Sequence, residues 1–401
     1  MRKPPKTVSQ APAIPASVMV GIVKDFVETH ATTTECPPAF MWSSFVTLFG
    51  AAIAPYVARN NALKTQPRLY TANIGQSGVT RRSTGCKRAS ELLRSAVGIA
   101  GIQVVNGFGS MEGLLRALQQ AQGVPVLNYF DELELMFKKA SVPGSAGTTP
   151  LHVLYEENAY SHTLRQGNLS LVNAHLALLG NATTDRFSDI WEGEHIDSGF
   201  FSRWMLVTAP VETRRMPNPQ LPDETRVSHL GSKIKEIFDR VRTQYIAQGS
   251  PVLIGFADEA AEKMWSDYYI DEIDPSDPSY NRIDTIGERL MMILALAQNQ
   301  TVIDIATVRA VIEFLRYQVA VRRILAPQVA ENPTARVQKK ILARLGPDGA
   351  LTRRELYRAV HADRYGTHIF DMALSGLQNL AIVKSDGDVY SLTTELPVET
   401  L

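Results

Sequence analysis

The spacing of apolar and polar residues predicts helices that alternate with short strands in the first half of the chain and helices in most of the second half. Short apolar runs at 69–74, 102–105 and 124–130 have the length and composition of buried strands, and a helical pattern follows each of them. Residues 16–31 form an amphipathic helical pattern, with its apolar face at Val18, Ile22, Val23, Phe26 and Val27. This alternation predicts an α/β core preceded by helices.

The apolar run from Ala39 to Val57 contains no charged residue and approaches the roughly 20 residues that a membrane helix needs. Three hydroxyl residues, Ser43, Ser44 and Thr47, lie within it, and prolines flank and interrupt it. We therefore expect a helix buried inside the protein and no contact with a membrane.

The second half begins with a proline-rich crossing at 210–223 and continues from Ser228 as a series of helical patterns, which predicts an all-α region. From Pro333 onward, three short helices and a hairpin with Asp386 and Gly387 at its turn form the pattern of a winged helix. The expected division is a flexible tail (1–15), a helical lead-in (16–65), a core (66–210), a helical lid (211–330) and a winged-helix domain (331–401).

Composition adds little to this picture. The 401 residues include 41 basic and 41 acidic ones, so any site for a polyanion must be local. The only cysteines, Cys36 and Cys86, are far apart in sequence and predict neither a disulfide framework nor a thiolate metal site. The basic, proline-rich N-terminus is followed by no apolar signal segment. These features favour a cytoplasmic protein.

A glycine-rich turn follows the first core strand and leads into a basic helix start. Glycines give the backbone freedom, hydroxyls can hold a metal ion, and arginines add positive charge where a helix N-terminus already favours anions. The strict phosphate-loop pattern has glycine and lysine where this chain has Thr80 and Arg81, and many turns between a strand and a basic helix look similar. The candidate phosphate-binding residues are Gly75, Gln76, Ser77, Gly78, Arg81, Arg82, Ser83 and Thr84.

Two adjacent carboxylates, Asp131 and Glu132, follow the apolar strand that begins near Val124. In nucleotide hydrolases such a pair serves magnesium and the attacking water: the first acid holds the metal shell, together here with Ser83 or Thr84, and the second polarises the water. The alternative is that Asp131 caps the next helix.

Three further polar residues are candidates for phosphate chemistry. Asn181 ends a predicted strand, where it either senses the terminal phosphate or serves as a turn residue. Arg203 precedes another strand and can stabilise phosphoryl transfer in its own or a neighbouring subunit, or else pair with Asp197 or Glu194. Arg289 is a second possible phosphate sensor, although a solvated helix-face arginine is the expectation we favour for it.

Nucleic-acid contacts are expected at two places. A predicted hairpin turns at residues 166–168, and Arg165 beside it could touch DNA in a ring pore. Basic residues outnumber acids in the predicted winged helix, which favours phosphate contacts over a protein-binding role. The candidate residues there are Lys339, Lys340, Arg353, Arg354 and Arg358.

The segments GQSGVTRRST, FDEL at 130–133, LLGNATTD at 178–185 and SGFFSRWMLV at 198–207 occur in an order that resembles a poorly characterised family of primase- and helicase-like P-loop ATPases from phages, plasmids and other mobile elements. In this alignment Gly75 matches the first glycine, Arg81 the arginine, Arg82 the lysine, Ser83 the small residue and Thr84 the hydroxyl.

The resemblance covers roughly residues 15–325. It implies a RecA/AAA+-like core that uses ATP and Mg²⁺ for helicase-like work on DNA during replication. It also implies a homo-oligomeric ring, with a hexamer as one candidate size, that shares Arg203 across interfaces, and a primase or another replication partner beside it. Because arginine does not replace lysine conservatively, Arg82 leaves a second class open: a non-catalytic nucleotide-binding adaptor or initiator.

Overall fold

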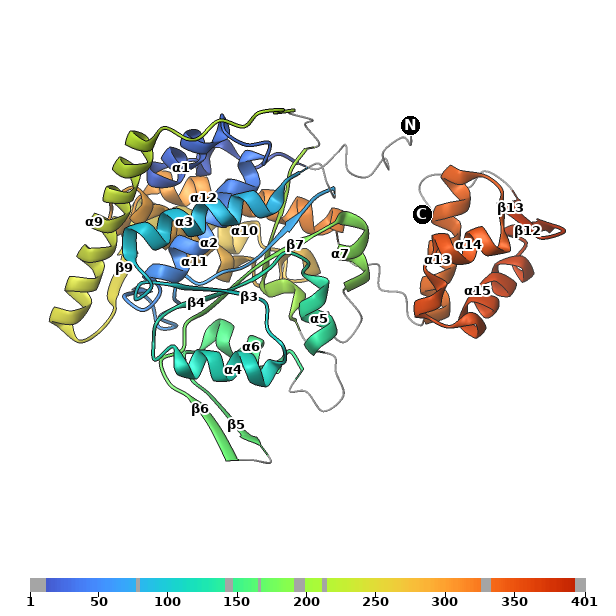
Figure 1. Cartoon of the computed structure of the whole chain (residues 1–401), viewed down its shortest axis with the longest axis horizontal. Helices are drawn as coiled ribbons and strands as arrows, with labels where there is room; N and C mark the ends of the chain where they lie inside the picture. The colour runs from blue at the N-terminus through green and yellow to red at the C-terminus, as the bar shows by residue number, and fades with distance from the viewer. Residues whose placement is uncertain are drawn as a thin grey trace. The chain divides into compact units, whose positions relative to one another are not determined.

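The computed structural model describes residues 12–76, 80–140, 147–164, 167–190, 199–210, 215–325 and 333–393. The chain forms two compact units, Met1–Ala326 and Pro327–Leu401, each with its own hydrophobic core (Figure 1). The first unit has an α/β fold with a parallel central sheet, so the predicted α/β class is confirmed.

Five parallel strands in the order β3-β4-β7-β2-β8 form the central sheet of the first unit. The chain leaves β2 in the sheet interior, crosses to β3 at the far edge, and returns through β4 and β7. In open parallel sheets a crevice forms at the carboxyl ends of the strands where the order reverses. The strands are β2 (Tyr70–Ile74), β3 (Gln103–Asn106), β4 (Val126–Phe130), β7 (Leu176–Ala182) and β8 (Trp204–Thr208).

Helix α2 (Pro38–Ile53) packs against the middle of this sheet, beside α3 (Arg82–Val97). Its hydroxyl residues bond to β2: the Thr47 and Thr71 hydroxyls lie 2.7 Å apart, and Ser43 donates to Asn73 Oδ1 over 2.6 Å. The apolar run is therefore a buried helix, as its serines and threonine predicted. None of the helices in the described part of the chain combines the length and apolar character that crossing a membrane requires.

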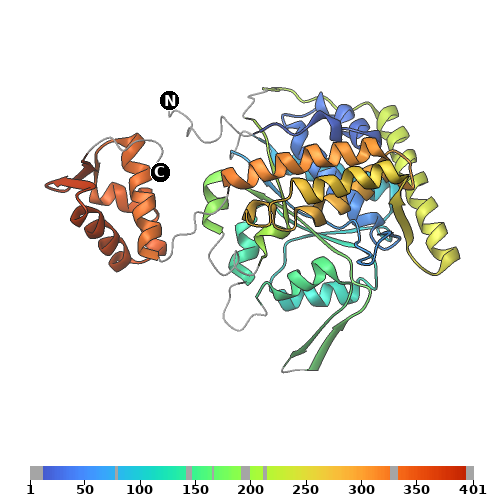
Figure 2. The same ribbon diagram turned by 180° about the vertical axis from the view of Figure 1, so that it is seen from behind.

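The region after residue 215 is not all-α. Strands β9 (Val252–Phe256) and β10 (Val302–Ile303) join β1 (Val57–Arg59) in a second parallel sheet of order β1-β9-β10. The prediction failed because the partner of β9 lies almost 200 residues earlier in the chain, where no local pattern indicates it. The main helices of the region are α9 (Glu224–Gln248), α10 (Glu259–Asp271), α11 (Ile283–Ala297) and α12 (Ile305–Leu325), the last three visible together in Figure 2.

Helix α12 closes one edge of the central sheet. The Gln318 side chain accepts from Leu206 N at 2.9 Å and donates to Leu206 O at 2.6 Å, which takes the place of a neighbouring strand on β8. Helix α1 (Gly21–Ala31) packs on α2, and α1, α2, α11 and α12 share one core with the sheet.

Between β4 and β7 the chain forms a hairpin, β5 (Tyr160–Leu164) and β6 (Gly167–Leu171), that projects from the body of the unit in Figures 1 and 2. The hairpin was predicted with its turn at residues 166–168, but Gly167 and Asn168 already belong to β6, which ends at Leu171 before β7 begins at Leu176. Short helices flank these strands: α4 (Met111–Gln120), α5 (Glu134–Ala140), α6 (Thr149–Glu156) and α7 (Thr184–Ile190).

The described part of the second unit contains three α-helices, a short 3-10 helix (Ala362–Arg364) and a three-stranded antiparallel sheet of order β11-β13-β12. Gly387, with φ +60°, lies in the two-residue turn of the β12–β13 hairpin, where the sequence predicted a turn. The elements are α13 (Pro333–Asp348), β11 (Leu351–Thr352), α14 (Arg353–Ala359), α15 (Thr367–Asn379), β12 (Val383–Asp386) and β13 (Val389–Leu392).

Candidate functional site

The glycine-rich turn joins the carboxyl end of β2 to the start of α3 at Arg82, so the predicted strand and helix on either side of it are confirmed. Gly75 N donates to Ala182 O of β7 at 3.1 Å. A Cβ at Gly75 would lie 3.1 Å from Thr80 Oγ1 and 3.2 Å from the Phe40 ring, so a larger residue would crowd this turn. Ser77 and Gly78 lie outside the described residues.

The Arg82 side chain turns back onto the sheet. Its Nη1 donates to Gly75 O and, over 2.7 Å, to Ala182 O, so it bridges the ends of β2 and β7. Burial lowers the pKa of Arg82, and the nearby charge of Asp131 opposes that shift. In this arrangement the residue that aligns with the phosphate-loop lysine is bonded to backbone carbonyls.

Arg81 precedes α3 in the left-handed conformation, with φ +41°. Its Nε donates to Glu35 Oε2 at 3.1 Å, and Glu35 Oε1 accepts from Met216 N at 2.7 Å. The bond from Met216 N and the guanidinium of Arg81 lower the Glu35 pKa. Ser83 is exposed and Thr84 half-buried in the first turn of α3, directly after the glycine-rich turn.

Asp131 directly follows β4 and is tied to two polar side chains of the sheet. Its Oδ1 accepts from the Tyr129 hydroxyl at 2.9 Å and from Asn181 Nδ2 at 3.1 Å, and Asn181 Nδ2 also donates to the Tyr129 hydroxyl at 2.7 Å. Helix α5 begins at Glu134, three residues after Asp131, so Asp131 does not occupy the position that caps this helix.

Glu132 points toward solvent, with its side chain 60% exposed, and its Oε2 lies 3.9 Å from Arg186 Nη1 of α7. Arg186 also pairs with Glu134. Because β2, β4 and β7 are parallel, Gly75, Asp131 and Asn181 meet at one edge of the sheet, as the sequence order suggested.

Tyr129 and Glu35 were not identified from the sequence. Tyr129 lies two residues before Asp131, so the alternation of a strand gave a signal that both side chains share a face. Glu35 gave no comparable signal, because its contacts come from loops distant in sequence.

Arg203 lies at the amino ends of the parallel strands, opposite the carboxyl ends where Gly75, Asp131 and Asn181 meet. It directly precedes β8, whose Trp204 pairs with Tyr70 at the start of β2, whereas Gly75 follows the end of β2. Six residue steps along the strands, about 20 Å, therefore separate the level of Arg203 from Gly75. Only 7% of Arg203 is exposed, and its Nη1 donates to Gly199 O at 2.8 Å. The alternative partners Asp197 and Glu194 lie outside the described residues.

Arg289 is only 1% exposed, so the expectation of a solvated arginine is wrong. Its guanidinium donates to the carbonyls of Gln66, Arg68 and Tyr155 at 2.8 to 3.0 Å, close to the amino end of β2. These bonds leave Arg289 far from the glycine turn and fit a structural role.

In the second unit the predicted basic residues differ in their surroundings. Arg354 and Arg358 are exposed on α14, four residues apart, and Lys339 is exposed on α13. Arg353 instead pairs with Asp371, and Lys340 Nζ lies 5.2 Å from the centre of the Tyr365 ring. Arg165 lies outside the described residues.

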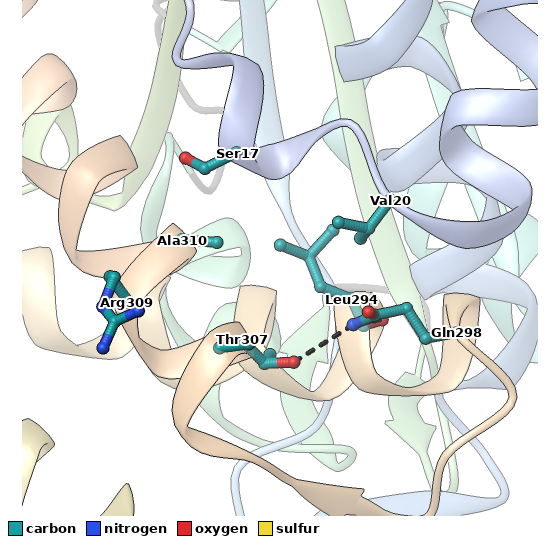
Figure 3. Close-up of a pocket in the computed structure, with 8 residues that line it drawn as sticks. Ser17, Val20, Leu294, Gln298, Thr307, Arg309 and Ala310 are labelled. Carbon is teal, nitrogen blue, oxygen red and sulfur yellow. Dashed lines mark hydrogen bonds between the residues drawn. The ribbon is translucent and has the colours of Figure 1, made fainter.

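A small pocket of about 210 Å³ near the start of α12 is lined by none of these candidate residues (Figure 3). Leu294, Ala306 and Ala310 contribute to its lining, and Gln298 Nε2 donates to Thr307 Oγ1 at 3.1 Å beside it. The comparison of the chain with protein-family models and with curated proteins gives no match.

Proposed function

We propose that the carboxyl edge of the central sheet binds ATP with magnesium and hydrolyses it. The observation that carries this proposal is the meeting of three strand ends: the glycine turn after β2, Asp131 after β4, and Asn181 in β7, which donates to Asp131 at 3.1 Å. This edge lies where the strand order reverses, which is where open parallel sheets bind ligands. The strand order also fits a RecA/AAA+-like core, in which the strand carrying the sensing residue separates the loop strand from the acidic strand.

In this proposal each described residue of the site has a role that follows from its position. The N-terminus of α3, which begins at Arg82, favours the phosphates. Glu132, exposed beside Asp131, is placed to orient a water molecule. Arg203 can act only on the nucleotide of a neighbouring copy, because it lies at the other edge of its own sheet. The proposal therefore includes a homo-oligomer.

The residues at the carboxyl ends of these strands fit a magnesium ion that is held by only a few protein ligands. Among the described residues, no group of three or more histidine, cysteine, aspartate or glutamate side chains could hold a metal ion. Magnesium commonly takes one or two carboxylates and completes its shell with water and substrate phosphates. Asp131 with Ser83 or Thr84 meets that requirement, and the bound ion would supply charge stabilisation for the phosphates.

The second unit supports action on DNA. Its three helices followed by a β-hairpin fit a winged helix, and Lys339, Arg354 and Arg358 are exposed on it. We therefore propose a helicase-like motor. Its place in the replication of a mobile element, and a primase or other replication partner, rest on the resemblance of its motifs alone.

Magnesium-dependent ATP binding tests the nucleotide site. Wild-type protein should bind ATP more tightly with Mg²⁺ than without it, as measured by calorimetry. Asp131→Asn should lose most of that difference while retaining the Mg²⁺-independent part. Equal binding by both proteins at every Mg²⁺ concentration would contradict the proposed site.

One observation favours the second candidate, a non-catalytic nucleotide-binding adaptor or initiator. The Arg82 guanidinium is bonded to Gly75 O and Ala182 O and would have to leave both to reach a phosphate. Such a protein would bind ATP and show no turnover. A measurement of ATP hydrolysis with and without single-stranded DNA separates the two candidates.

A further inference from the structure

Tyr129 lies at the centre of the polar side chains that connect β4 to β7. In the register of these parallel strands, Tyr129 pairs with Leu179, two residues before Asn181. Side chains two apart in a strand point to the same face, so Tyr129 and Asn181 share the face that α2 covers. Tyr129 is thereby placed within reach of both Asp131 and Asn181.

The direction of each hydrogen bond in this group follows from chemistry. An ionised carboxylate only accepts and an amide nitrogen only donates. The Tyr129 hydroxyl must therefore donate to Asp131 Oδ1, at 2.9 Å, and accept from Asn181 Nδ2, at 2.7 Å. The 3.1 Å bond from Asn181 Nδ2 also ends on Asp131 Oδ1. No described residue donates to the other oxygen, Oδ2.

The same reasoning fixes the orientation of the Asn181 amide. Its NH₂ group must face the carboxylate and the phenol, so its Oδ1 points away from them. That oxygen is buried, on a side chain only 1% exposed, and has no hydrogen-bond partner among the described residues. An unpaired buried acceptor is costly unless a donor such as water occupies the position.

We propose that Tyr129 is the positioning residue of this site. It holds the Asp131 carboxylate by Oδ1, which leaves Oδ2 for the magnesium shell, and it turns Asn181 so that Oδ1 accepts from a water molecule. Hydrogen bonds to metal-ligating carboxylates commonly change metal affinity or activity by about 10- to 100-fold. This inference rests on the proposed nucleotide function and adds a residue to it.

The test compares Tyr129→Phe with Tyr70→Phe, using ATP and Mg²⁺ as the probes. Tyr70 is a matched control, because its buried hydroxyl donates to Leu151 O at 2.9 Å near the amino end of the same sheet. Calorimetric ATP titrations over a series of Mg²⁺ concentrations give the half-saturating Mg²⁺. Tyr129→Phe should raise this value about tenfold or more, with ATP affinity in the absence of Mg²⁺ unchanged. Tyr70→Phe should change neither quantity.

A Tyr129→Phe protein with wild-type Mg²⁺ dependence would overturn the positioning role while leaving the nucleotide site intact. Wild-type protein without Mg²⁺-dependent ATP binding would instead refute the proposed function, and the positioning role with it. Asn181→Ala provides a second variant that removes the other donor to Oδ1. If the two residues act together, the double variant should be less impaired than the product of the two single effects.

Discussion

Arg82 on α3 donates over 2.7 Å to the carbonyl oxygen of Ala182, the last residue of β7. With its second bond to Gly75 O, this contact makes Arg82 a bridge between the strand before the glycine turn and the strand that carries Asn181. Both bonds come from Nη1 of the guanidinium, which carries two hydrogens and can donate to two carbonyls. Arg82 therefore joins β2 to β7 at their carboxyl ends.

Removing this bridge should destabilise the protein. Arg82→Met keeps the apolar stem and removes the hydrogen bonds to Gly75 O and Ala182 O, which should lower the free energy of unfolding by about 1–3 kcal/mol. Arg81→Met is the matched control, because it removes only the solvent-exposed ion pair of Arg81 with Glu35 and should cost less than the loss of the Arg82 bonds. Urea denaturation measures both. Equal losses of unfolding free energy in the two variants would show that the Arg82 bonds stabilise the protein no more than the exposed Arg81 ion pair does.

Acid should destabilise the first unit through buried histidines. Burial and the nearby Arg68 lower the pKa of His175 to about 3, so the folded protein keeps this ring neutral where the unfolded chain, near pKa 6.5, takes up a proton. Stability should therefore fall as the pH drops from 6.5 towards 3, by up to about 1.4 kcal/mol per pH unit. His30, whose pKa burial lowers to about 4, should add to the loss.

His175→Gln should make the unfolding free energy less dependent on pH in this range. The measurement is urea denaturation at several pH values between 4 and 7. An unchanged slope in the variant would mean that other groups cause the acid sensitivity.

The position of Arg203 predicts complementation between subunits. Arg203→Ala and Glu132→Gln should each abolish ATP hydrolysis, because each removes one part of a site shared by two copies. A mixture of the two variants should recover part of the activity, since some interfaces combine an intact Glu132 with an intact Arg203 of a neighbouring copy. Hydrolysis that stays at background in co-assembled mixtures would contradict a shared site.

The exposed arginines of α14 should carry DNA affinity that depends on salt. Arg354→Ala with Arg358→Ala should weaken duplex binding and reduce the slope of log affinity against log salt by about 2, as expected for two lost phosphate contacts. Arg353→Ala should have a smaller effect on this slope, because Arg353 is paired with Asp371. Fluorescence anisotropy across a salt series tests this. If only Arg353→Ala changed the slope of log affinity against log salt, the phosphate contact would belong to Arg353 and not to Arg354 and Arg358.

The sequence was informative where local pattern decides structure. The apolar run before Gly75, the acids after β4 and the turn at Gly387 all follow from rules that span a few residues. Parallel strands then bring Gly75, Asp131 and Asn181 to one edge without further information from the sequence. This is why the order of these segments along the chain was enough to predict that the three residues lie close together.

Long-range contacts could not be predicted in the same way. Strand β9 looked like part of a helical region because its partner β1 lies far earlier in the chain. The Arg82 side chain bonds to Ala182, 100 residues away, and nothing in the loop sequence indicates that acceptor. The sequence correctly predicted that Arg203 precedes a strand. Only the strand direction shows that it lies at the amino ends of the strands, away from the glycine turn.

The most direct test of the central claim is ATP hydrolysis by the purified protein, with and without single-stranded DNA, beside Glu132→Gln. We expect turnover that DNA stimulates and that the variant loses, while the variant still binds ATP. Bound ATP with no turnover in either protein would contradict a motor and support the adaptor or initiator, with Arg82 retained on its two carbonyls.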